Sequence, residues 1–455
     1  MIYLCLIIVK VMEDRMNKLK NSQLAKVLSG SFIIKITGTF LTFLVSIILA
    51  RTLGVENYGH YAYAISIISI LSVPTTLGLP NVIVRFSASY KTKSEWNFLK
   101  GLINLTNKSV LLIAIFIMFF SFLISWYFVG DNDSIAYNTF LISLLLLPLM
   151  ALNSLRAAAL RGINRVIIGQ LPEHIILPFV FISFSLIATI FFEEINSIEA
   201  MFLRVLSVLI AFLIGAALLY NNLLINIKSK KPKYEIKKWV HSALPLLFVG
   251  GMMLINNKLD IIMLGAIRSS IEVGIYQVVI NAATLIVFAL SAVNSVMAPQ
   301  FSKLFIKEEK CKLQRIVTLS NRVAFAFALP VSLIFIIFGS WILHFIYGAD
   351  FARGGIALAI LSLGQLVSAA FGSVGNLLNM TGNEKFSAFG VVISAICNII
   401  LNSLLIPVWG INGAAIATSV SLMLWNALLA FWVYKKVKIY PSIVGNGFKL
   451  FKRRL

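Results

Sequence analysis

Long apolar stretches recur along almost the whole chain and limit what it can fold into. A helix needs about 20 consecutive apolar residues to cross the hydrocarbon core of a bilayer. Charged residues make up only 12% of the 455 residues, against about a quarter in soluble proteins. This composition excludes a soluble globular enzyme and predicts an all-α polytopic membrane protein. Twelve expected membrane spans lie near 30–50, 59–80, 104–128, 134–153, 166–192, 198–221, 240–263, 274–297, 316–338, 355–378, 386–406 and 412–433.

Lysine and arginine are unevenly distributed between alternate loops of this pattern. With the N-terminus inside, the inner loops and ends hold 31 of the 39 basic residues, and the outer loops hold three, Arg51, Arg268 and Arg353. Because cytoplasmic loops are rich in Lys and Arg, we expect both termini in the cytoplasm and the chain in the inner (plasma) membrane. The same distribution explains most of the net charge of +22 without a nucleic-acid partner.

The spans are expected to form two six-helix bundles joined by a basic linker, KSKKPKYEIKKW with its flanks. An upstream-start artefact is one interpretation of the first fifteen residues. The expected order is an inner N-terminal lead at 1–29, a first bundle at 30–221, the inner linker at 222–239, a second bundle at 240–433 and an inner basic tail at 434–455.

A short motif is repeated at equivalent span junctions of the two halves. Each copy has Leu-Gly, then an acidic residue, then Gly-x-Tyr at the start of the next helix. Both junctions have the same orientation, which indicates a parallel repeat with a pseudo-two-fold axis along the membrane normal. The copies are Leu53, Gly54, Glu56, Gly59 and Tyr61, and Leu264, Gly265, Glu272, Gly274 and Tyr276.

Four ordered segments resemble one family of exporters. They are SGSFIIKITGTFLTFLVSIILARTLGVENYGHYAYA with GLPNVIVRFSASY, then NKLDIIMLG with EVGIYQ, PQFSKLF, and WGINGAAIATS. The chain resembles the polysaccharide and O-antigen (Wzx-type) oligosaccharide flippases of the MATE-like (MOP) exporter superfamily. The resemblance implies a V-shaped pair of bundles around a central cavity. It also implies a polyprenyl-pyrophosphate-linked oligosaccharide as cargo, moved from the inner to the outer leaflet among membrane lipids, with a polysaccharide polymerase and glycosyltransferases as possible partners.

Three other functions stay open at this point. A MATE-type drug antiporter would favour an acid-lined site, whereas five cations and one clear anion lie within the expected spans. A lipid II flippase would have additional spans. A membrane polysaccharide polymerase or glycosyltransferase would need a catalytic outer loop, and the outer loops are short, so we do not expect an enzyme.

Polar residues along the spans are the candidates for the cargo path. Lys35, Thr39 and Thr42 share one face of the first span, and Gln277 and Asn281 share one face of the eighth. Asn398 in span eleven and Arg85 after span two complete this set. The alternative interpretation is that the hydroxyls and amides join helices, while the cations reach toward the lipid headgroups.

Asp260 is the acid that lies well inside a span, with Asn256 one turn earlier on the same face. A carboxylate at that depth either pairs structurally or binds a coupling ion, such as a proton or Na+. No other cofactor is expected. The three cysteines, Cys5, Cys311 and Cys397, are too far apart in the sequence for a metal site of short ligand spacing.

Overall fold

The computed structural model describes residues 23–129, 134–191 and 195–445, and every regular element within them is a helix. The all-α membrane prediction is confirmed in this form, because nine helical stretches among these residues are long and apolar enough to cross a membrane. The first part of the expected inner lead, with its segment 1–15, and the tail beyond residue 445 lie outside the described residues.

The N-terminal helices begin with one long element that is bent near its middle. Gly54 interrupts α2 with a φ of 70°, a left-handed conformation that glycine adopts without strain. The elements are α2 (Gln23–Thr76), α3 (Leu79–Thr92), α4 (Trp96–Val129), α5 (Ile135–Ser143), α6 (Leu146–Gly162), α7 (Val166–Leu171), the π-helical turn η1 (Pro172–Ile176), α8 (Leu177–Phe191), α9 (Ser197–Leu219), the π-helical turn η2 (Tyr220–Leu224) and α10 (Ile225–Ile227).

The C-terminal helices end with a similar bent element. Gly410 interrupts α16 with a φ of 52°. The elements are α11 (Ile236–Ile267), α12 (Ser270–Ile306), α13 (Lys310–Tyr347), the 3-10 turn η3 (Ala349–Gly354), α14 (Gly355–Phe371), α15 (Val374–Met380) and α16 (Glu384–Val437).

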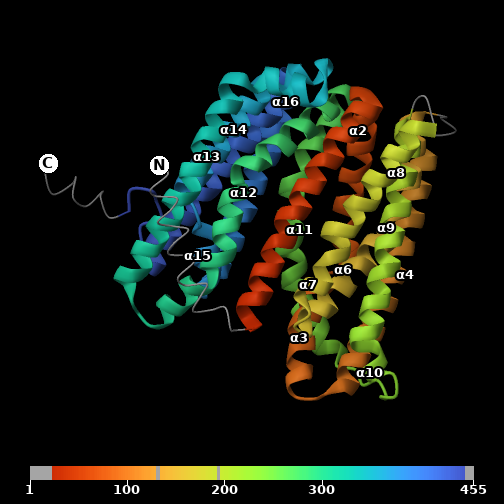
Figure 1. Cartoon of the computed structure of the whole chain (residues 1–455), viewed down its shortest axis with the longest axis vertical. Helices are drawn as coiled ribbons and strands as arrows, with labels where there is room; N and C mark the ends of the chain where they lie inside the picture. Colours follow the sequence, from red (N-terminus) through yellow and green to blue (C-terminus); the bar gives the residue numbers. More distant parts are fainter. Residues whose placement is uncertain (1–22, 130–133, 192–194, 446–455) are drawn as a thin grey trace, which may run out of the picture.

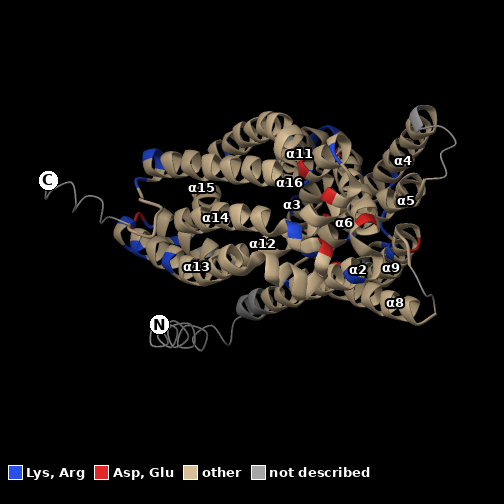
Figure 2. Cartoon of the chain, turned by 90° about the horizontal axis from the view of Figure 1, so that it is seen from above, with Lys and Arg blue, Asp and Glu red and all other residues tan. Residues whose placement is uncertain are grey.

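The N-terminal group of helices (α2 to α10) and the C-terminal group (α11 to α16) pack differently at the two ends of the molecule. At one end, a single apolar core contains residues of both groups, such as Leu49, Ile68, Tyr276 and Ile406. Toward the other end the core divides, with one part centred on α3, α4 and α6 and the other on α12, α13, α15 and α16. The groups therefore meet at one end and diverge toward the other, as Figure 1 shows. Seen from above, α13, α14 and α15 lie on one side of the molecule and α4, α5, α8 and α9 lie on the other (Figure 2).

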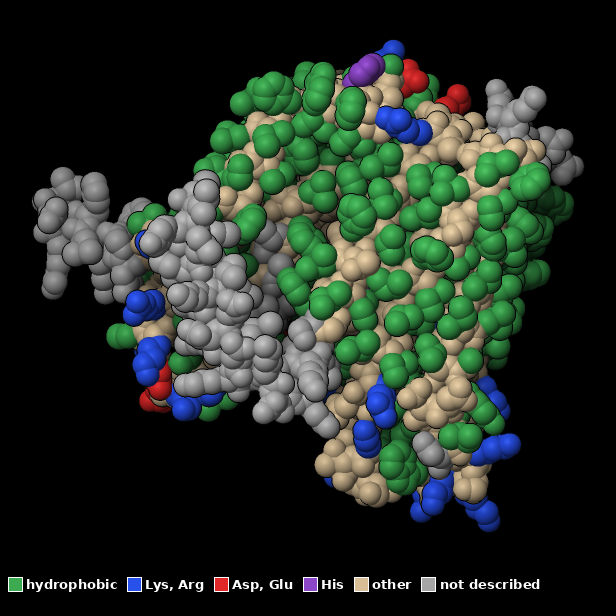
Figure 3. Space-filling model, viewed as in Figure 1, with side chains coloured by type: hydrophobic (Ala, Val, Ile, Leu, Met, Phe, Trp, Pro, Cys, Tyr) green, Lys and Arg blue, Asp and Glu red, His purple; other side chains and the backbone are tan. Residues whose placement is uncertain are grey.

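Basic side chains gather at the end where the groups diverge, which we call the basic end (Figure 3). The turns after α3, α10 and α12 lie there, and they carry Lys93, Lys230 and Lys307. We call the other end, where the groups share a core, the closed end. Apolar side chains cover the surface between the two ends in the same view, as expected for a surface that faces lipid.

Two segments expected to lie between spans are helical. The expected inner loop 81–103 contains α3, whose buried residues Leu79, Val82, Ile83 and Phe86 form one apolar face. Span four was expected to end at 153, but α6 continues to Gly162 because its last turns are buried among neighbouring helices. Within span five, the helix is interrupted by the π-helical turn η1, which begins at Pro172.

Candidate functional site

The two copies of the repeated motif contact each other at the closed end. A Cβ on Gly59 of α2 would overlap the carbonyl oxygen of Ser270, and a Cβ on Gly274 of α12 would overlap the carbonyl oxygen of Val55. Each glycine thus allows the backbone of the other half to approach closely. This reciprocal contact is what a pseudo-two-fold axis between the two copies would produce.

A cluster of polar side chains lies next to this contact and joins α2 to α12 and α13. Asn281 donates through Nδ2 to Ser46 Oγ at 2.9 Å and to the Tyr58 hydroxyl at 3.3 Å. Gln277 donates to Asn281 Oδ1 at 2.8 Å, and Ser46 donates to the Tyr347 hydroxyl at 3.4 Å. We call these five residues the closure cluster.

A second polar cluster surrounds Asp260, which is 3% exposed. Asn402 donates to Asp260 Oδ1 at 2.7 Å and to Asn398 Oδ1 at 3.0 Å. Thr418 and Tyr276 donate to Asp260 Oδ2, Tyr276 at 3.3 Å. The carboxylate is therefore held by neutral donors from α12 and both arms of α16, without a basic partner among the ion pairs of the described residues.

The Asp260 cluster also contains oxygen atoms that make no hydrogen bond. Asn402 Oδ1 is buried without a partner, and so is Oδ1 of Asn256, one turn before Asp260 on α11. Carboxylate, amide and hydroxyl oxygens are the ligands that hard cations prefer. The residues present therefore fit a small cation such as Na+, and the carboxylate also fits a proton.

The expected polar face of the first span lies nearer the basic end. Lys35, Thr39 and Thr42 are exposed on α2, and the two threonines donate to the carbonyl oxygens of Lys35 and Gly38 in their own helix. Gly38 allows η1 to approach α2 closely at His174. Lys35 and Arg161 both act electrostatically on His174, so three basic groups from α2, α6 and η1 lie near one another.

Arg85 is not part of that group. It lies exposed on α3, 5.8 Å from the ring centroid of Phe86. The structure thus brings Gln277 together with Asn281 at the closure, and Asn398 together with Asp260, but keeps Arg85 apart from Lys35.

Several residues of these sites were missed in the sequence. Tyr58, Tyr347 and Thr418 carry hydroxyls that complete the two clusters, and only Tyr58 had a signal, since it directly precedes the repeated glycine. Arg156 was assigned to a loop but is 3% exposed within α6, and its guanidinium nitrogens make no hydrogen bond. Gly215 of α9 leaves room for that guanidinium. The apolar pattern that continues to Leu160 was the available signal for a longer helix.

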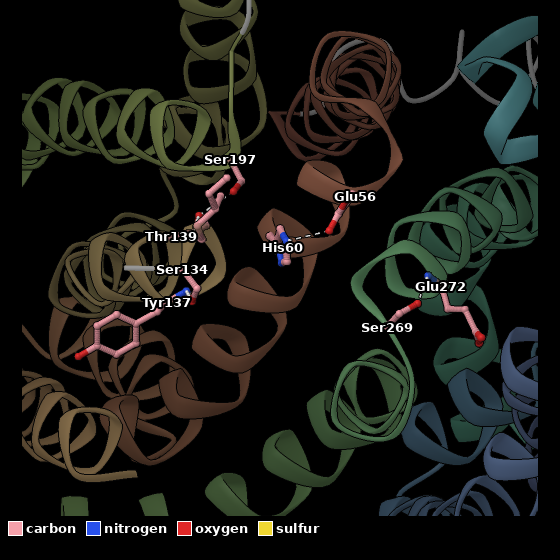
Figure 4. Close-up of polar contacts among 9 residues, drawn as sticks. Glu56, His60, Ser134, Tyr137, Thr139, Ser197, Ser269 and Glu272 are labelled. Carbon is pink, nitrogen blue, oxygen red and sulfur yellow. Dashed lines mark hydrogen bonds and ion pairs between the residues drawn. The ribbon is translucent and has the colours of Figure 1, made fainter. Parts of the chain in front are cut away.

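Figure 4 shows further polar contacts at the closed end. His60 Nε2 lies 4.0 Å from Glu56 Oε1 one turn earlier in α2. Thr139 and Ser197 share a hydrogen bond of 2.7 Å between α5 and α9. Ser269 accepts from the backbone of Glu272 and begins α12 as an N-cap.

Comparison with known sequences identifies the family. A family model described as "Polysaccharide biosynthesis protein" matches residues 25–305, more than half of the chain. The chain belongs to this family. The Haloferax volcanii protein "Probable low-salt glycan biosynthesis flippase Agl15" is 24% identical over 91% of this chain and 84% of that protein. The "Putative O-antigen transporter" of Shigella flexneri is 24% identical over 86% of this chain and 92% of that protein.

Solved structures show the fold to be that of known exporters. An inward-facing multidrug resistance MATE family transporter of the MOP superfamily superposes with a TM-score of 0.71 and 12% identity, over 90% of this chain and 98% of that one. The lipid II flippase MurJ in an inward closed conformation gives a TM-score of 0.69 and 18% identity, over 88% and 86%. Together with the family match, this shared fold confirms the resemblance seen in the sequence motifs.

Proposed function

We propose that this protein is a flippase that moves a lipid-linked oligosaccharide, a repeat unit of a surface polysaccharide, across the membrane. The observation that carries the proposal is the family match, together with relatives named as flippases and transporters that align along most of the chain. Transport of a lipid requires no bond to be broken, so the protein needs no catalytic residues for it.

The proposed path runs between the two groups of helices from the basic end. Counting two passes for each of the bent helices α2 and α16, and one for α11, gives twelve passes in two bundles. The Lys and Arg side chains at the basic end support a cytoplasmic location for that end and for both termini, in the inner membrane. The structure then corresponds to a state that is closed toward the outside.

We infer that the cargo's pyrophosphate is attracted by Lys35 together with Arg161. These two side chains supply the positive charge, Lys35 is exposed on α2, and His174 lies between them as a neutral neighbour. Thr39 and Thr42 continue the polar face toward the closed end. Arg85, exposed on α3, contributes to the positive rim at which the lipid headgroup first arrives.

Asp260 is the proposed coupling-ion site, with Asn256, Asn398, Asn402 and Thr418 as oxygen ligands. The titratable group that faces it is Tyr276 of α12. A proton or Na+ that binds there in one conformation and leaves in the other would bias the equilibrium between inward-open and outward-open states.

The cargo assignment is tested by flipping of a fluorescent polyprenyl-pyrophosphate oligosaccharide in reconstituted vesicles. The parent protein should move it, and Lys35→Ala should reduce the rate about tenfold because a charge-assisted contact to phosphate is lost. The matched control is Lys385→Ala, an exposed lysine at the start of α16, which should transport normally. Transport of a cationic drug and not of the lipid would favour the antiporter instead.

The coupling assignment is tested in the same vesicles with a Na+ or pH gradient. Asp260→Asn keeps the hydrogen-bonding shape but cannot exchange charge, so transport should lose its dependence on the gradient, while Asp260→Glu should keep part of it. A well-folded Asn variant with the gradient dependence of the parent would show that the coupling ion binds elsewhere.

A further inference from the structure

Helix α12 takes part in both polar clusters within little more than one helical turn. Tyr276 extends toward Asp260 among the C-terminal helices. Gln277 and Asn281, one turn apart, lie on a different face of α12, where Asn281 reaches α2. Since residues of one helix move together as a rigid unit, a displacement at Tyr276 is carried to Asn281.

We propose that α12 transmits the state of the Asp260 site to the closure cluster, with Tyr276 as the positioning residue that responds to the carboxylate. The proposal rests on the coupling function proposed above. With the carboxylate free, its oxygen Oδ2 accepts from Tyr276 and holds α12 in the closed position. A proton or Na+ on that oxygen weakens it as an acceptor, so α12 is released and Asn281 leaves Ser46 and Tyr58.

The closure cluster is suited to this response because some of its hydrogen bonds are long. Two of them, Asn281 to Tyr58 and Ser46 to Tyr347, measure 3.3 and 3.4 Å. Each net hydrogen bond changes an equilibrium by about two- to tenfold. A change in one or two bonds at Asp260 is therefore comparable with one or two bonds of the closure cluster, which act beside the apolar core that both groups of helices share.

The equivalent tyrosine of the first half has no such role. Tyr61 stacks on Phe181 and on Tyr58, with ring centroids 6.4 Å apart in each case. The neighbours of Tyr61 are aromatic rings and Arg204, which lies over the Phe181 ring, whereas the hydroxyl of Tyr276 meets a carboxylate and a hydroxyl. The two copies of the motif have thus diverged, and the second copy alone places its tyrosine beside a buried acid.

Opening at the closed end can be measured by the distance between spin labels on α2 and η3. Glu56→Cys and Asp350→Cys are exposed positions on the two sides, labelled after Cys5, Cys311 and Cys397 are replaced by serine. The full-length protein in lipid nanodiscs is compared in NaCl and in KCl, each at an acidic and a neutral pH.

We expect the parent distances to depend on the ion or the pH, and Tyr276→Phe to lose that dependence. Asn281→Leu should shift the population toward the open form about tenfold in every condition, and Ser46→Ala, which removes the acceptor from the other side, should shift it in the same direction. Thr284→Val is the matched control, because Thr284 on the same helix bonds only to the carbonyl oxygen of Asn281, and it should behave as the parent does.

A Tyr276→Phe protein whose distances still respond as the parent's do would overturn the relay. The relay would also be overturned if Asn281→Leu and Ser46→Ala both stayed closed. Failure of the coupling function itself is recognised separately, because transport by the parent would then be independent of the gradient and equal to that of Asp260→Asn.

Discussion

Single residues at the basic end attach the start of α11 to the N-terminal helices. The Tyr90 hydroxyl donates to Glu235 Oε2 at 2.6 Å and accepts from the indole of Trp239 at 2.9 Å. Hydrogen bonds from Tyr90 and then from Lys238 hold the pKa of Glu235 below its ordinary value. Trp239 is almost fully buried in the core around α3 and α4, so the linker is fixed to the first half and not free between the halves.

Tyr90→Phe should therefore lower the melting temperature of the purified protein. The variant leaves the buried indole N–H of Trp239 without an acceptor, a cost of about 1–3 kcal/mol, and removes a donor to Glu235. Because the pKa of Glu235 is lowered in the folded state, ionised Glu235 adds to the stability of the fold at pH values above its unfolded pKa of about 4.3. This gain in stability is lost as the pH falls through the lower pKa of the folded state. The control is Tyr234→Phe, at an exposed position in the linker next to Glu235. If Tyr90→Phe lowers the melting temperature by the same amount at neutral and acidic pH, Glu235 contributes nothing to the stability.

Among the elements, α2 and α12 form the closed end through backbone contact at Gly59 and Gly274. Alanine at either position would place a methyl group on a carbonyl oxygen of the facing helix. Overpacking of this kind costs about 1–3 kcal/mol, so Gly59→Ala and Gly274→Ala should each disfavour the closed end by about tenfold or more. Spin-label distances between positions 56 and 350 would report it. Gly250→Ala in α11 is the control, because its added Cβ meets nothing within 4 Å, and it should leave the distances unchanged. If Gly59→Ala and Gly274→Ala both keep the closed population of the parent, the backbone contact does not hold the closed end.

The helices were predictable from the sequence because the length of an apolar stretch and the spacing of residues along a helix are local properties of the chain. The repeat also placed Gly59 and Gly274 at equivalent junctions, although their contact depends on how the halves pack. The surroundings of Asp260 were only partly predictable. Asn256 follows from helical spacing, but Thr418 is 158 residues away and joins the carboxylate only because α16 is bent back at Gly410. Arg156 was missed because a basic residue was taken as the end of a span, whereas its guanidinium packs against Gly215 of α9.

For the whole molecule, orientation in the membrane follows from the asymmetry of charge between the two ends. Basic residues follow the turns where the helices diverge, and the closed end has few of them (Figure 3). Short loops that are rich in Lys and Arg stay on the cytoplasmic side, so the many lysines and arginines of the basic end favour one orientation. We therefore expect the closed end to face away from the cytoplasm, which is the arrangement an exporter needs in order to receive its cargo from inside.

Reporter fusions test that orientation directly. Fusions at Lys231, in the linker before α11, and at Lys310, at the start of α13, should be active inside the cell, as should a C-terminal fusion. Fusions at Ser197, at the start of α9, and at Trp409, at the bend of α16, should be active outside. Trp409 is the most informative position because it divides α16 into two passes. An inside signal there, with outside activity at Ser197 retained, would mean that α16 does not cross twice, and the pseudo-two-fold relation between the halves would fail with it.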